Sequence, residues 1–227
     1  NMAAYFRLFR QKIVFETGLS LNHIFIQTFQ TRTLNGPDAE IQPFRIKRPS
    51  LNGMLGLSWN PTSVTNLKWN CSTGFRAPNL AELSSNGLHE GVFRYEIGDP
   101  GLKVEQNFNN DLSFEYSSTA FFVNVSGFYN YFRHYVYLAP TDETFFGFDV
   151  FRYRQQHAAL YGAEISTTLK PPSIKGWQWK ESFASTEGKL IDGAYLPFIP
   201  AYKLCSAVRW EHAFKTKSFY LEPELQY

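Results

Sequence analysis

Long hydrophobic runs are missing from this sequence. No stretch approaches ~18 consecutive apolar residues and the mean hydropathy is −0.30, so a membrane-spanning helix is excluded. Charge is also scarce, because Asp, Glu, Lys and Arg together make up 19% of the residues and the net charge is +2. Since no basic block is present, binding to nucleic acid has little support.

Sequence signatures of enzymes are missing as well. The chain holds no Gly-x-Ser-x-Gly elbow, phosphate-binding loop, His-Glu-x-x-His pair or dinucleotide fingerprint. A hydrolase would need a serine and a histidine close together on one face. Ser126 and His134 share a face but lie too far apart along one predicted strand. We therefore expect that the chain is not an enzyme.

Two further absences concern disulfide pairs and a leader sequence. The only cysteines, Cys71 and Cys205, fall on opposite faces of their predicted strands, so both are predicted to be unpaired. The chain begins Asn1-Met2, and no charged and apolar segments of a signal peptide precede the first predicted strand. We expect the chain to be a fragment of a longer protein.

Aromatic residues, by contrast, are abundant. They make up 18% of the chain, a load that suits strands and membrane-interface belts better than helices. Alternation and turn signals predict about ten strands. Their approximate ranges are 3–10, 12–29, 49–60, 64–77, 106–117, 119–139, 156–170, 174–188, 201–213 and 217–227.

The predicted strands share a two-residue period. Between residues 106 and 116, the even positions are mostly apolar and the odd positions are all polar. A soluble sheet could show this pattern, but it recurs in nearly every strand, and the polar face would line the interior of a closed barrel. The sequence therefore predicts an all-β, antiparallel transmembrane β-barrel. Representative lipid-facing positions are Phe114, Val123, Ile165 and Leu221, and representative interior positions are Asp111, Asn124, Glu164 and Glu222.

The predicted connections are sorted by length. Tight turns join the strands at one end, and long loops at about 30–48, 78–105, 140–155 and 189–200 join them at the other. Membrane barrels have this arrangement, with short periplasmic turns and longer extracellular loops. The alternative is a soluble or surface β-sandwich that binds glycan or protein. The two differ in detergent dependence, because a barrel segment exposes its apolar face.

Two sequence boxes resemble the barrel of TonB-dependent outer-membrane receptors. The first is Phe75-Arg76-Ala77-Pro78, and the second runs from Gly98 to Glu105. Between them, residues 86–91 with Arg94-Tyr95-Glu96 resemble the zinc- and haem-receptor branches of this family. The resemblance covers roughly residues 50–210.

This resemblance implies a barrel of roughly 22 strands with a plugged lumen, of which residues 1–227 would form about ten strands. The plug domain would be absent from the chain. The implied location is the bacterial outer membrane, in contact with its lipid. The implied function is uptake of a scarce metal or metal chelate, namely haem, zinc or a ferric siderophore. TonB would be the partner, through the missing plug region, and haem or zinc would be cargo rather than a permanent cofactor.

His89 is the main candidate for contact with cargo. In haem-receptor relatives a histidine in this interval is an iron ligand, and neutral imidazole suits either iron or zinc. Glu90 is the only adjacent potential ligand, which is too few for a zinc site of three or four. A solvated loop histidine is the alternative. Arg94 and Tyr95 could recognise an anionic chelate, because guanidinium matches carboxylate geometry.

Two further histidines are weaker candidates for a metal site. His134 and His157 flank the predicted loop 140–155 and could approach His89 across the barrel mouth, or simply bond to water at the rim. The Phe75-Arg76-Ala77-Pro78 box has a structural interpretation first. Pro78 ends strand pairing because it lacks an N–H, so the box is expected to position the long loop 78–105 rather than contact cargo.

Overall fold

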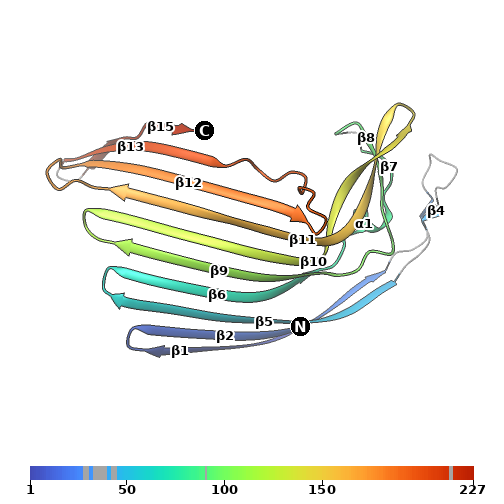
Figure 1. Ribbon diagram of the computed structural model, residues 1–227, viewed down its shortest axis with the longest axis horizontal. Coiled ribbons are helices and arrows are strands. Elements are labelled where there is room, and N and C mark those ends of the chain that lie inside the picture. The colour runs from blue at the N-terminus through green and yellow to red at the C-terminus, as the bar shows by residue number, and fades with distance from the viewer. Residues whose placement is uncertain (28–30, 33–39, 42–44, 90, 215–216) are drawn as a thin grey trace.

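The chain folds into one large curved β-sheet (Figure 1). This is a computed structural model, and it describes the chain except for residues 28–30, 33–39, 42–44, 90 and 215–216. The sheet has 13 strands, ten of which follow one another along the chain in a single row. That row is β1 (Met2–Arg10), β2 (Ile13–Gln27), β5 (Arg45–Thr62), β6 (Thr65–Arg76), β9 (Glu105–Ser117), β10 (Phe121–Phe145), β11 (Phe148–Leu169), β12 (Trp177–Leu190), β13 (Lys203–Phe214) and β14 (Lys217–Leu221).

Neighbouring strands of this row are antiparallel throughout, which confirms the predicted fold class. The remaining strands lie beside the row. The hairpin of β7 (Asn86–His89) and β8 (Arg94–Ile97) joins β11, and β15 (Glu224–Gln226) pairs with β13. The short strands β3 (Thr31–Arg32) and β4 (Glu40–Ile41) form a separate pair. In the described residues, no helix is long and apolar enough to cross a membrane.

The register of the sheet separates apolar from polar rows. One row across β6, β9, β10, β11 and β12 consists of Leu67, Phe114, Val125, Ile165 and Phe183. The next row on the opposite face consists of Lys68, Ser113, Ser126, Glu164 and Ala184. Large hydrophobic side chains of the first row stay exposed, and Ile165 is 40% accessible. This apolar face needs a lipid environment, as the alternation of the sequence predicts.

The connections at one end of the sheet are tight, whereas those at the other end carry most of the irregular structure (Figure 1). The predicted loop 140–155 is wrong. Strands β10 and β11 continue through it and meet at Phe146 and Gly147, which both have positive φ. The polar residues that suggested a loop lie on paired strands, because a hairpin that extends beyond the membrane can face water on both sides. The predicted loop 30–48 lies partly outside the described residues.

The connection 78–105 has more structure than a plain loop. It holds the short helix α1 (Leu80–Ser84) and the β7–β8 hairpin. The helix starts because Asn79 and Glu82 form a capping box, in which each side chain accepts from the other's backbone N–H. Leu83 of this helix packs with Leu102 and Val136 in a small core beneath the connection. Both cysteines are free, as predicted.

Candidate functional site

Arg76 anchors the long connection to the sheet. It ends β6 in register with Glu105 of β9, and its Nη2 lies 3.1 Å from Glu105 Oε2. Its Nη1 lies 2.8 and 2.9 Å from the two carboxylate oxygens of Glu82 on α1. One guanidinium therefore joins a strand partner and a helix, a geometry that suits its planar set of donors. Pro78, between these contacts, is fully buried.

The two carboxylates that bind Arg76 also accept hydrogen bonds from backbone N–H groups. Glu82 also accepts a hydrogen bond from the backbone N–H of Asn79, at 2.8 Å. Glu105 accepts from the backbone N–H of Val136, at 3.0 Å, just beyond an irregularity in β10. Both side chains are nearly buried, with 11% and 9% of their surface exposed. These contacts join the end of β6 to α1, and place the Phe75-Arg76-Ala77-Pro78 box at the base of the connection.

Glu96 is the centre of a second cluster, on the β7–β8 hairpin. Glu96 is 6% exposed, and three side-chain groups contact its carboxylate. His89 Nδ1 and Arg94 Nε lie 2.9 and 2.7 Å from Oε1, and the Tyr153 hydroxyl donates to Oε2 at 3.2 Å. Parallel pairing of residues 95–97 with residues 150–152 fixes the hairpin on β11. The cluster therefore joins the hairpin to the extended part of the sheet.

The contact with Glu96 determines which nitrogen of His89 is free. Burial would raise the pKa of Glu96, but hydrogen bonds from His89 and Arg94 outweigh it and hold that pKa below its usual value. The carboxylate is therefore ionised near neutral pH and can only accept. The proton of a neutral His89 must then lie on Nδ1, which leaves the Nε2 lone pair available. The His89 side chain is 56% exposed.

The other residues that are predicted to contact cargo are more buried than His89 or are already paired. Tyr95 is buried, its ring lies 4.5 Å from that of Phe145, and its hydroxyl donates to Asn86 Oδ1 at 2.7 Å. Arg94 is paired with Glu96, and its guanidinium lies 5.2 Å from the ring centre of Phe151. Arg94 keeps 22% of its side-chain surface exposed, so only this part of the side chain is open to contact with a ligand. Glu90 lies outside the described residues.

His134 and His157 lie next to each other on paired strands rather than on either side of a loop. Their ring centres are 5.5 Å apart, and His134 has a φ of 61° at the irregularity between Phe132 and Tyr135. Across the described parts of the chain, no three His, Cys, Asp or Glu residues gather in a way that could hold a metal ion. A metal at His89 would therefore need further ligands from elsewhere, such as those of a haem or another chelate.

Sequence reasoning missed the three carboxylates that organise both clusters. Glu82 had a detectable signal, because an asparagine followed three residues later by a glutamate is typical of a capping box. Glu96 had a weaker one, since Arg94 and Glu96 are two residues apart and share a strand face. Glu105 lies in the second family box. Tyr153 had no signal, because its contact with Glu96 depends on the pairing of β8 with β11.

Acidification should loosen the β7–β8 hairpin. The pKa of Glu96 is lower in the folded protein than in an unfolded chain, where a glutamate titrates near ~4.3. The stability from this carboxylate is therefore fully present above that pH and is lost as the pH falls through the lower folded pKa. Amide hydrogen exchange of residues 86–97, corrected for intrinsic rates, measures the change. If a Glu96→Gln variant loses as much protection on acidification as the unsubstituted protein does, Glu96 is not the cause.

Comparisons with known proteins identify the family. The family model described as TonB dependent receptor-like, beta-barrel, matches residues 17–224. The iron-regulated outer membrane virulence protein of Vibrio cholerae serotype O1 (strain ATCC 39315 / El Tor Inaba N16961) is 27% identical over 146 residues, which cover 60% of this chain and 22% of that protein.

Solved structures show the same fold. The copper transporter OprC aligns with a TM-score of 0.77 and 16% identity, over 92% of this chain and 31% of its own. The siderophore receptor PirA from Pseudomonas aeruginosa aligns with a TM-score of 0.63 and 16% identity, over 99% of this chain and 36% of its own. The chain thus spans about a third or less of these relatives.

The family match settles the alternatives that the sequence left open. A soluble β-sandwich is excluded, because the family model covers most of the sheet, from β2 to β15. The family model that matches is that of a receptor β-barrel, so the chain is not an enzyme. The chain belongs to the TonB-dependent receptor β-barrel family, in the bacterial outer membrane.

Proposed function

We propose that this chain contributes the cargo-contacting rim of a receptor that imports a scarce metal or metal chelate, with TonB as the partner. Residues 1–227 would form part of a larger closed barrel, and TonB would act through the plug of the whole receptor. Two findings support this proposal. The chain spans 31% and 36% of two solved receptors of this fold, and its irregular connections gather at one end of the sheet.

The geometry of His89 carries the proposal for haem or zinc. A histidine that binds a metal commonly donates its other ring N–H to a carboxylate, which fixes the tautomer and the orientation of the ring. Glu96 stands in that relation to His89, with Nδ1 2.9 Å from Oε1. The exposed Nε2 is then a preformed ligand. Arg94, beside it, supplies a cation that would suit a carboxylate of the cargo.

A ferric siderophore is the second candidate cargo, and exposed aromatic residues favour it. Phe93, in the turn of the β7–β8 hairpin, is 75% exposed, and Phe146, at the tip of the β10–β11 hairpin, is 87% exposed. The β7–β8 hairpin, which also carries His89, and the β10–β11 hairpin lie at the same end of the sheet (Figure 1). Large aromatic side chains in water offer stacking surfaces for a flat organic chelate. In this case His89 would not be essential for affinity.

Uptake by cells tests the function itself. Cells that produce the whole receptor should accumulate one cargo among haem, zinc, copper and a ferric siderophore, and inactivation of TonB should abolish that accumulation. The cargo that competes with the others identifies the substrate class. Accumulation that is unchanged without TonB would contradict energised import, and accumulation of none of the four would contradict a metal receptor.

Replacing Glu96 with glutamine should weaken binding of haem or zinc by roughly 10- to 100-fold, the usual effect of losing a carboxylate behind a histidine ligand. The substitution keeps the size of the side chain but removes the charge that holds the proton on Nδ1. The measurement is an equilibrium titration of the purified whole receptor. Glu143→Gln is the matched control, because the side chain of Glu143 makes an exposed ion pair with Arg152. Equal affinities in the two variants would remove Glu96 from the site.

A further inference from the structure

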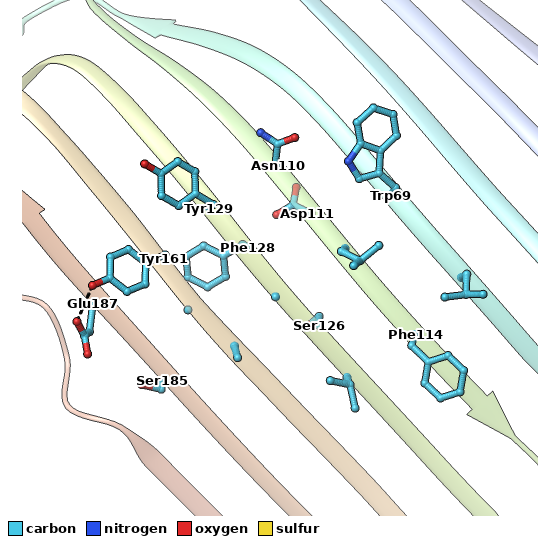
Figure 2. A pocket seen from close by; sticks show the side chains of 16 residues that line it. Trp69, Asn110, Asp111, Phe114, Ser126, Phe128, Tyr129, Tyr161, Ser185 and Glu187 are labelled. Atoms are coloured by element: carbon cyan, nitrogen blue, oxygen red, sulfur yellow. Dashed lines mark hydrogen bonds between the residues drawn. The ribbon is translucent and has the colours of Figure 1, made fainter.

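An open trough crosses the apolar face of the sheet, away from the β7–β8 hairpin. It has a volume of about 1060 Å³, comparable to the largest small-molecule pockets. Its lining residues come from β6, β9, β10, β11 and β12 and mostly belong to the lipid-facing set. Figure 2 shows Trp69, Phe114, Tyr129 and Tyr161 around the trough. The Tyr161 hydroxyl donates a hydrogen bond to Glu187. The trough therefore opens toward the membrane.

Small side chains make the floor of the trough. Gly127, Ala163 and Ser185 lie side by side on β10, β11 and β12 in one row of the sheet. The neighbouring row toward the tight turns is large and apolar, with Val125, Ile165 and Phe183. A side chain on Gly127 would meet little, because the nearest atom to its Cβ would be Gly162 O at 3.7 Å. The depression follows from side-chain size, and it leaves space that a lipid chain can fill.

The end of the trough nearer the long connections becomes aromatic and cationic. The next row holds Tyr129, Tyr161 and Glu187, and the row after it holds Tyr131, Ala159 and Lys189. Lys189 Nζ lies 3.1 Å from Glu187 and 4.9 Å from the ring centre of Tyr195. Tyrosine and lysine side chains in rows at this end of the trough are typical of a membrane–water interface.

Arg133 adds a second cation on the same face, two residues beyond Tyr131. It is exposed, and within the described residues it makes no ion pair. Lys189 is paired with Glu187, so Arg133 supplies the uncompensated positive charge among the described residues of these rows. The rings of His134 and His157 lie beside it, 5.5 Å apart. This excess of positive charge at an interface attracts an anion.

We propose that the trough is a binding site for an anionic, phosphate-bearing lipid of the outer leaflet. One acyl chain lies over Gly127, Ala163 and Ser185, and the phosphate lies between Arg133 and Lys189. Two features of the trough favour an anionic lipid as the ligand. The apolar floor opens toward lipid, and the cations stand at the end of the trough where the extracellular interface lies. The site is separate from the cargo cluster and does not depend on the identity of the cargo.

Titration of the purified whole receptor in detergent tests the site, with bound lipid counted by native mass spectrometry. The probes are phosphatidylglycerol, phosphatidylcholine with the same acyl chains, and inorganic phosphate. We expect phosphatidylglycerol to bind more tightly than phosphatidylcholine. In an Arg133→Gln/Lys189→Gln variant, affinity for phosphatidylglycerol should fall roughly 30-fold, because each cation contributes independently near a membrane surface. Arg10→Gln, an exposed cation near a tight turn, is the control.

A Gly127→Leu/Ala163→Leu variant fills the trough without adding polarity. It should weaken binding of both lipids by roughly tenfold or more, since an acyl chain loses its buried contacts. Leu21→Phe, an exposed apolar position on β2, should leave binding unchanged. Unchanged lipid binding in the filled variant would overturn the proposal. Equal affinities for the two lipids, or full competition by inorganic phosphate, would overturn it as well.

Discussion

Replacing Ile165 with arginine should lower the free energy of unfolding of the whole receptor in lipid by ~2–4 kcal/mol, the penalty for a cation near the bilayer midplane. Ile165 lies on the apolar face of β11, four residues from the end of that strand at the tight turns. A spanning strand takes ~9–11 residues, so this position is close to the middle of the membrane. Urea-induced unfolding in lipid vesicles measures the loss.

Ser166→Arg is the matched control for this substitution. Ser166 is the next residue on β11, but it faces the polar interior, in register with Asn124 and Ser182. An arginine there stays in a hydrated environment, so its effect on unfolding should be far smaller. Equal losses at the two positions would contradict the assignment of the two faces, and a larger loss at Ser166 would reverse it.

Replacing Arg76 with alanine should lower the free energy of unfolding by roughly 2–4 kcal/mol, near the lower part of the range for breaking a buried ion pair, because Arg76 itself is partly in water. The substitution leaves Glu82 and Glu105 nearly buried and without a cation. It should also release α1 and the hairpin from the end of β6. Urea-induced unfolding and limited proteolysis within residues 77–104 measure the two effects.

Two companion variants show whether the unpaired carboxylates cause the loss. Arg152→Ala removes an arginine from an exposed pair with Glu143 and should change stability by about 0–1 kcal/mol. Arg76→Ala combined with Glu82→Gln and Glu105→Gln should recover part of the loss, because neutral amides no longer leave buried charge unpaired. A triple variant that is less stable than Arg76→Ala would contradict this explanation.

The sheet could be predicted from the sequence because its signal is local. A two-residue period is visible within a single strand, as at Leu112 and Phe114 against Asp111 and Ser113, and tight turns mark where strands end. Ten predicted strands correspond in order to the ten of the main row. The signal failed at residues 140–155, where strands leave the membrane. Both faces there can be polar, so alternation no longer separates a strand from a loop.

The candidate site was predictable only in part. His89 could be singled out because it lies between two family boxes, but its partner Glu96 depends on the fold of the hairpin. Tyr153 and Glu96 are 57 residues apart in sequence, and their hydrogen bond depends on the parallel pairing of β8 with β11. Local patterns contain no information about such a pairing. Burial of Tyr95 likewise follows from its contact with Phe145 on the extended β10.

The most direct test of the account is the affinity of the whole receptor for haem and for zinc, measured by titration with and without His89→Ala. We expect the substitution to remove a metal ligand and to weaken binding of one of these cargoes strongly. His212 lies near the C-terminal end of β13, which is at the opposite end of the sheet from the β7–β8 hairpin (Figure 1), so His212→Ala should bind as the unsubstituted receptor does. Unchanged affinity for both cargoes in His89→Ala would contradict the role of His89 and favour a siderophore held by aromatic and arginine contacts.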